Sequence, residues 1–88
     1  MKNISGSITA GLTAQTLSAA SESRAFLFFQ NISDTDMYLS EIGTATADTP
    51  SIKVAAGATL TLTGVPQCRG AWSLYCATTG KKFTAREA

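Results

Sequence analysis

The chain has 88 residues and a formal net charge of +1, and only 15% of its residues are charged. This balance excludes electrostatic capture of nucleic acid or of an acidic membrane surface as the main function. A chain of this length forms one domain with a thin core, and small domains often gain stability by forming oligomers.

Residues 1–22 are predicted to form an extended N-terminal arm ahead of a β-domain over residues 23–88. The arm consists mostly of Ser, Thr, Ala, Gly and Asn. Gly6, Gly11 and the β-branched threonines disfavour a helix, and one short strand is expected around 12–17. The apolar side chains are too sparse for an independent element, so we expect the arm to order against a neighbouring chain. A disordered tail is the alternative.

Residues 24–30 form the first firm strand, because β-favouring side chains run through the whole segment. Large apolar side chains lie on both of its faces. Phe26 and Phe28 face one way. Leu27 and Phe29 face the other. A single small sheet covers one face with its own core, so the second face needs a lid from the arm of the same chain or from a partner, and we expect a partner.

Five further strands are predicted along the rest of the domain. Turn residues such as Gly, Pro, Asn and Asp separate them. The expected strands cover residues 37–42, 51–54, 59–63, 72–76 and 82–86. No segment combines a helical period with sufficient length. The pattern therefore predicts an all-β fold, a small single-domain β-sandwich or β-barrel of about 6–8 short antiparallel strands.

The sequence offers no catalytic site and no metal or cofactor site. It has no histidine, so histidine triads, histidine bases and histidine metal ligands are absent. Asp34 and Asp36 lie in a turn that lacks the further oxygen ligands and the glycine of a calcium loop. We therefore expect a protein that is not an enzyme and that carries no cofactor.

A small basic end is formed by Lys81, Lys82 and Arg86, beside Phe83. Basic residues next to aromatic rings on strands can bind single-stranded nucleic acid. Because the rest of the chain has no basic stripe, we expect no nucleic-acid partner.

The two cysteines are interpreted as free thiols. If Cys68 and Cys76 lay along one extended segment they would be about 26 Å apart, whereas a disulfide needs Cα atoms within about 7 Å. A sharp reversal at Gly70 would be required to join them, and this remains the alternative. We expect Cys76 to be a small core residue and Cys68 to lie in a loop.

No secretion signal or membrane span is predicted. The N-terminal segment has no continuous apolar region after Lys2, and no apolar run reaches the roughly 18 residues of a membrane helix. We therefore expect a chain that is made and kept in the cytoplasm until it joins a larger assembly, with no membrane partner.

The order of these segments resembles that of small structural proteins of tailed bacteriophages. A Ser/Ala-rich arm leads to Ser23-Arg24, an apolar strand and the segment 30–33 (Gln-Asn-Ile-Ser). Met37-Tyr38-Leu39, a Gly/Ala/Thr loop, the segment 52–57 (Ile-Lys-Val-Ala-Ala-Gly) and a final strand within 80–87 follow. The resemblance is to capsid decoration or cement proteins and covers about residues 10–88. It implies a small β-sandwich or barrel, often trimeric, without catalytic residues.

The resemblance also implies a function. The chain is expected to be a structural virion protein that forms a homotrimer and clamps neighbouring subunits on the outer surface of the capsid. Its partners would be further copies of itself and the major capsid protein or another virion protein. It would be made in the host cytoplasm and reside in the virion. The alternative is a small tail, baseplate or fibre component that binds another virion protein or a host glycan.

The expected oligomer or capsid interface consists of apolar residues from the arm and from the first firm strand. These residues are Ile4, Ile8, Leu12, Leu17, Leu27 and Phe29.

Overall fold

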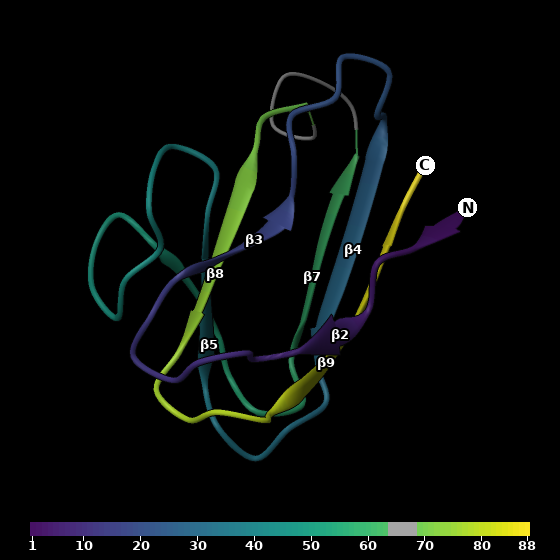
Figure 1. The fold of residues 1–88 in the computed structure, drawn as a ribbon. Coiled ribbons are helices and arrows are strands. Elements are labelled where there is room, and N and C mark those ends of the chain that lie inside the picture. The colour runs from purple at the N-terminus through teal and green to yellow at the C-terminus, as the bar shows by residue number, and fades with distance from the viewer. Residues whose placement is uncertain (64–68) are drawn as a thin grey trace.

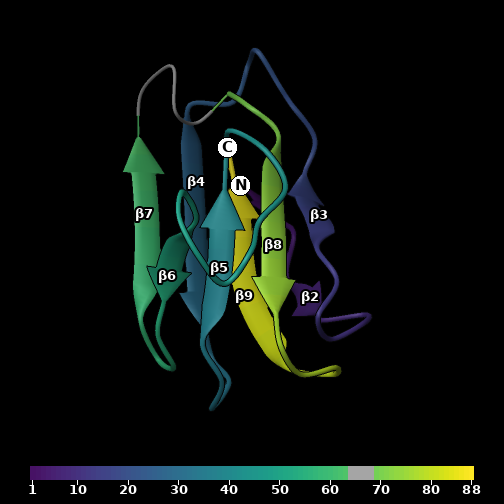
Figure 2. The same ribbon diagram turned by 90° about the vertical axis from the view of Figure 1, so that its left-hand side faces the viewer.

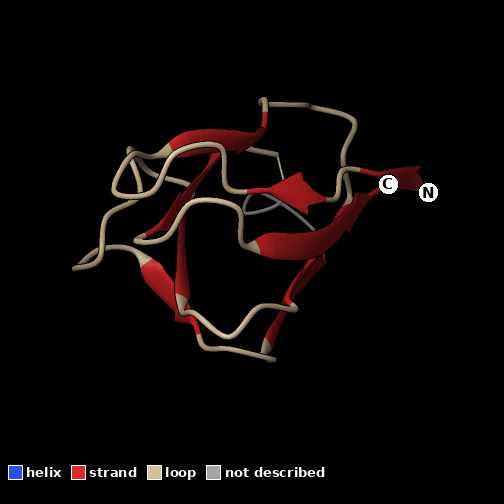
Figure 3. Cartoon of the chain, turned by 60° about the horizontal axis from the view of Figure 1, so that its bottom comes forward, coloured by secondary structure: helices blue, strands red, loops and turns tan. Residues whose placement is uncertain are grey.

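Nine short strands and no helix lie in the two parts of the chain that the computed structural model describes, residues 1–63 and 69–88. All strand pairs are antiparallel, and the strands form two sheets that pack as the layers of a sandwich (Figures 1, 2 and 3). The predicted all-β, single-domain fold is thereby confirmed. The described residues include no helix with the length and apolarity needed to cross a membrane.

The two sheets each have four strands along their main path. Sheet A has the order β1 (Lys2–Asn3), β9 (Lys82–Glu87), β4 (Phe26–Asn31) and β7 (Thr59–Thr63), and β2 (Gly6–Ser7) also pairs with β9. Sheet B has the order β3 (Gln15–Ser18), β8 (Trp72–Cys76), β5 (Met37–Ser40) and β6 (Ile52–Val54). The central strands β4, β9, β5 and β8 carry most of the core.

The core lies between the sheets and is built by alternate residues of the central strands. Trp72, Leu74 and Cys76 are the inward residues of β8 and are fully buried. The rings of Phe29 in β4 and Phe83 in β9 stack with their centroids 5.4 Å apart. This alternation of buried and exposed residues is the period of two that the sequence showed in the same segments.

Residues 1–22 lie on the sheets of their own chain. β1 and β2 pair with β9, and β3 pairs with β8. Ile8 is only 2% exposed and Leu17 only 8% exposed, and both belong to the core. Residues 1–22 were expected to form an extended arm. The structure instead places them within the packed domain. The strand expected near Leu12–Leu17 is present as β3, while β1 and β2 had not been predicted.

Gly11 allows the N-terminal segment to approach the turn between β8 and β9. A Cβ atom at this position would lie 2.6 Å from the carbonyl oxygen of Ala77 and 2.9 Å from the amide nitrogen of Thr79. The amide of Gly11 donates to Thr79 Oγ1 at 2.7 Å, and the amide of Leu12 donates to the carbonyl of Cys76 at 3.0 Å. Only glycine permits this close contact of two backbones.

Asn31 connects the turn after β4 to strand β6 from a fully buried position. Its Nδ2 group donates to the carbonyl oxygens of Thr35 at 2.7 Å and Val54 at 2.9 Å. Its Oδ1 atom accepts from the amide and the hydroxyl of Ser33 at 3.0 and 2.6 Å. The side chain therefore satisfies its hydrogen-bonding groups without water, as a buried amide must.

Candidate interaction surface

The outer face of β4 carries two phenylalanines that no strand of the described residues covers. Along β4, Leu27 and Phe29 turn into the core while Phe26 and Phe28 turn outward and are half-buried. The alternation predicted for this strand is therefore present. The large apolar side chains left for a partner are Phe26 and Phe28, because the core already encloses Leu27 and Phe29.

We call the surface around these two rings the outer A face. It consists of alternate residues of three adjacent strands: Phe26, Phe28 and Gln30 of β4, Thr59, Thr61 and Thr63 of β7, and Lys82, Thr84 and Arg86 of β9. In the register of the sheet, Phe28 lies between Thr61 and Arg86. Cross-strand neighbours at this spacing are close enough for their side chains to interact.

The charge of the outer A face is positive, since Lys82 and Arg86 are exposed and its members include no carboxylate. Lys81 precedes Lys82 in the sequence, but its charge is engaged in an ion pair. Its Nζ atom lies 2.7 Å from Asp34 Oδ1. The hydrogen bond from Lys81 holds the pKa of Asp34 below its ordinary value of 3.8. The basic end predicted from the sequence is thus divided between a surface ion pair and the outer A face.

A surface of this kind is suited to contact with another protein. Aromatic residues and arginine are enriched in the centres of protein interfaces. The threonines are short, so ordering them on binding requires little loss of side-chain entropy.

A second surface feature is a hollow of about 350 Å³ beside the beginning of β8. Its lining residues are Thr16, Glu41, Gly43, Thr44, Ala71, Trp72 and Ser73. Glu41 is the single carboxylate among them, beside the hydroxyl-bearing Thr16, Thr44 and Ser73. Within residues 1–63 and 69–88, no three His, Cys, Asp or Glu side chains gather in a way that could hold a metal ion.

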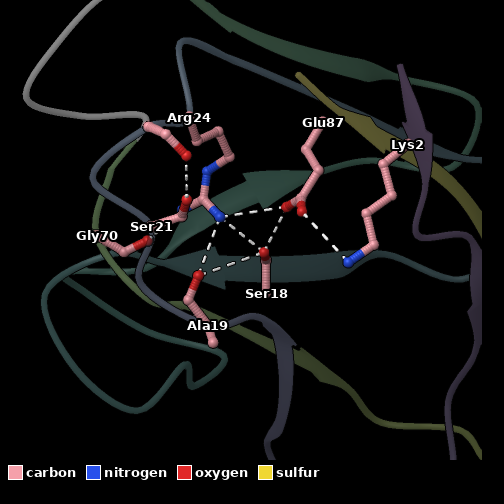
Figure 4. Close-up of polar contacts among 8 residues, drawn as sticks. Lys2, Ser18, Ala19, Ser21, Arg24, Gly70 and Glu87 are labelled. Atoms are coloured by element: carbon pink, nitrogen blue, oxygen red, sulfur yellow. Dashed lines mark hydrogen bonds and ion pairs between the residues drawn. The ribbon is translucent and has the colours of Figure 1, made fainter.

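A buried ionic cluster lies at the end of sheet A where β4 begins and β9 ends (Figure 4). Arg24 is 3% exposed, and its Nη1 atom lies 3.2 Å from Glu87 Oε1. Nη1 also donates to Ser18 Oγ at 2.7 Å and to the Ala19 carbonyl at 3.0 Å, and Nη2 donates to the Gly70 carbonyl.

The cluster holds four segments together. Ser18 Oγ donates to Glu87 Oε1 at 2.6 Å, and Lys2 Nζ lies 3.9 Å from Glu87 Oε2. The N-terminal segment, the segment before β4, the end of β9 and the segment before β8 are thus joined through Arg24. The printed contacts of Arg24 all run to other segments of the chain, so the cluster ties these segments to the strands that form the outer A face.

The residues predicted as an interface occupy three kinds of position. Ile8, Leu17, Leu27 and Phe29 are buried in the core. Ile4 is partly buried against it. Leu12 is 71% exposed and has a positive φ of 63°. Of these six side chains, Leu12 is the one that the structure presents openly to a partner.

The sequence-based interpretation did not include Phe26, Phe28 or the threonines of β7 in the interface. The alternation along β4 was visible in the sequence, but the direction of the core was not. Cys76 is a free thiol buried in the core, as predicted. Cys68 and residues 64–67 of the loop predicted over 64–70 lie outside the described residues.

Comparison of the sequence with models of protein families, with curated proteins and with solved structures finds no match in any of the three.

Proposed function

We propose that this chain is a structural virion protein of a tailed bacteriophage, of the decoration or cement kind, that associates with itself and binds neighbouring capsid subunits from outside. The observation that supports the proposal is the outer A face. It presents Phe26 and Phe28, both half-buried, on the outward side of a central strand. The order of sequence segments that resembles such proteins supports it independently.

The outer A face would act as a binding surface for a capsid subunit. A phenylalanine that is fully buried on binding contributes about 1.5–3 kcal/mol, so two half-covered rings can supply a modest interface in each copy. Many copies on one particle multiply this effect through avidity. The Arg24 cluster and the sheet hold the rings in place before binding, which limits the entropy lost on association.

The proposal is tested by adding the purified chain to particles that lack it. Phe28→Ser should reduce the number of bound copies strongly at a concentration near half-saturation for the natural chain. Gln30→Ala, on the same face of the same strand, should change binding much less. Both variants should keep the thermal midpoint of the natural chain to within a few degrees, because neither position is in the core.

The location of the chain in the native particle gives the second part of the test. A copy number comparable to that of the major capsid protein supports a role on the shell. A small copy number confined to the tail would instead support the tail, baseplate or fibre alternative. Absence of the chain from purified particles, or equal binding by Phe28→Ser and the natural chain, would overturn the proposed role of the outer A face.

A further inference from the structure

Strand β7 is an edge strand of sheet A that, as far as residues 1–63 and 69–88 show, carries none of the usual protection against pairing. It runs over five residues, pairs with β4 on one side, and has no backbone partner on the other side among the described residues. Natural edge strands are usually kept short, charged, irregular or covered. β7 contains only Thr and Leu, with no charge, no proline and no irregularity in its register.

The other sheet edges are protected in these ways. β1 and β2 are two residues each. β3 has a register shift between Thr16 and Ser18. β6 is three residues long and carries Lys53, which lies 3.3 Å from Asp36. β7 is therefore the longest regular edge in the described part of the sandwich.

The hydrogen bonds on the two sides of β4 show which backbone groups of β7 point toward the open edge. The amide of Asn31 donates to the carbonyl of Ala58 at 3.0 Å, whereas Phe26 exchanges hydrogen bonds with Ala88 on the opposite side of β4. Because the bonding side alternates along a strand, Leu60 and Leu62 direct their backbone groups toward β4. The amides and carbonyls of Thr59, Thr61 and Thr63 therefore point toward the open edge.

The sequence of β7 reads the same in both directions, Thr-Leu-Thr-Leu-Thr. If two copies pair antiparallel about a two-fold axis at Thr61, each Thr61 lies opposite the other Thr61. Thr59 then lies opposite Thr63, and Leu60 opposite Leu62. The opposed threonines are also the residues whose backbone groups face the open edge. The same register therefore pairs like side chains and forms the backbone hydrogen bonds between the two copies.

The leucines of β7 give this register an apolar component. Leu60 and Leu62 point to the inner side of sheet A, but they are only partly buried against the core. In the two-fold arrangement, Leu60 of one copy would lie beside Leu62 of the other, in a pair without backbone hydrogen bonds, where side chains approach most closely. Such an arrangement would remove further apolar surface from water.

We propose that β7 is a self-association edge, through which two copies of this chain form a two-fold dimer with one continuous sheet. A two-fold contact requires a surface that is complementary to itself, and the palindromic strand provides it. In this dimer the two outer A faces lie side by side, with the threonines of β7 between the two pairs of phenylalanines. The inference concerns the chain in solution and does not depend on the proposed binding to capsid subunits.

The test uses charge pairs across the proposed axis. One variant carries Thr59→Lys, Thr61→Lys and Thr63→Lys, and a second carries Glu at the same three positions. All three side chains are exposed, so each variant is expected to fold. In a dimer of either variant, like charges would oppose each other in every threonine pair. Dimerisation should weaken roughly ten- to a hundred-fold in each variant alone.

Mixing the two variants provides the decisive measurement. Equal amounts of the Lys and Glu variants should form a mixed dimer that native mass spectrometry identifies by its mass, because every pair would then join opposite charges. A control variant with Thr13→Lys, Thr44→Lys and Thr78→Lys, all exposed and outside strands, should dimerise like the natural chain. Circular dichroism confirms that each variant is folded.

Three outcomes would overturn the inference. The first is a natural chain that stays monomeric in sedimentation equilibrium at millimolar concentration. The second is an oligomer, such as a trimer, whose mass neither the Lys nor the Glu variant alters. The third is a failure of the mixed variants to associate although each is folded. Loss of particle binding by Phe28→Ser tests the proposed function alone, so the two proposals can fail separately.

Discussion

Arg24 and Glu87 form an ion pair of 3.2 Å that joins the beginning of β4 to the end of β9. Arg24 is almost fully buried and also donates to Ser18, to Ala19 and to Gly70. A buried cation is tolerated because its guanidinium fork meets several acceptors at once. The residue that precedes the apolar strand therefore fixes the position of that strand relative to the rest of the domain.

Replacing Arg24 should be strongly destabilising. Arg24→Ala would remove the buried cation that pairs with Glu87 and the donor to the carbonyls of Ala19 and Gly70. Removal of one partner of a buried pair costs about 3–5 kcal/mol in the free energy of unfolding. Arg24→Lys should recover only part of this, since one ammonium cannot replace the fork. Urea denaturation measures both values. Arg86→Ala is the exposed control, and a loss below about 1 kcal/mol for Arg24→Ala would contradict this account.

Gly11→Ala should loosen the N-terminal segment from the turn after β8. The added methyl group would lie 2.6 Å from the Ala77 carbonyl oxygen, so the two backbones must separate. We expect a loss of about 1–3 kcal/mol in the free energy of unfolding. Gly43→Ala is a matched control, because a Cβ atom there has no neighbour within 4 Å. Equal stability of the two variants in chemical denaturation would show that the close approach is not required.

Asn31→Ala should also be destabilising, although it removes only a small polar group. The carbonyls of Thr35 and Val54 would lose their donor in a buried place, and each unpaired buried group costs about 1–3 kcal/mol. We therefore expect a loss of about 2 kcal/mol or more in the free energy of unfolding. Gln30→Ala, one residue earlier and facing outward, should cost less. The reverse order of the two variants would refute the assignment of Asn31 as a structural anchor.

The strands could be predicted from the sequence wherever apolar and polar residues alternate. In β7 and β8 the alternation sets the two faces apart, and the predicted bounds 59–63 and 72–76 agree with the structure. In β4 both faces are apolar, so the pattern does not distinguish inside from outside. The direction is decided by tertiary contacts, among them the stacking of Phe29 on Phe83, which lies far away in the sequence.

The place of the N-terminal segment could not be predicted for a related reason. Its side chains are small, and Ile8 and Leu17 alone give too weak a signal for a core element. The segment is held mainly by pairing of its backbone with β9 and β8, more than fifty residues away. Such pairing depends on the partner strand and leaves little trace in the composition of the segment itself.

The ion pair between Asp34 and Lys81 predicts a small dependence of stability on pH. The hydrogen bond from Lys81 lowers the pKa of Asp34 in the folded chain, so the pair stabilises the fold above the pKa of the unfolded chain. This contribution is lost as the pH falls through the folded pKa. Because the Asp34 side chain is 80% exposed, the effect should be slight and screened by salt.

The measurement for this pair is an NMR titration of the Asp34 carboxyl group, with a midpoint expected below 3.8. The thermal midpoints of the natural chain and Asp34→Asn should differ slightly at neutral pH and converge in strong acid. A carboxyl group that titrates at or above 3.8 would show that the ion pair does not persist in solution.

Removing residues 1–20 should unfold the domain. The truncation deletes two core side chains, Ile8 and Leu17, each worth about 1.5–3 kcal/mol when buried. It also removes three strands and leaves edges of β8 and β9 without partners. The loss is comparable to the whole stability of a small domain, commonly about 5–15 kcal/mol. Circular dichroism should show no cooperative thermal transition at the midpoint of the natural chain.

Two point variants separate the loss of packing from the loss of chain length. Ile8→Ala should cost about 2–5 kcal/mol in the free energy of unfolding, as expected for a core residue. Leu12→Ala, four residues further along, should have little effect because that side chain is largely exposed. A truncated chain that melts like the natural one would show that the segment does not belong to the domain. In that case it would be free to pack on a neighbouring chain.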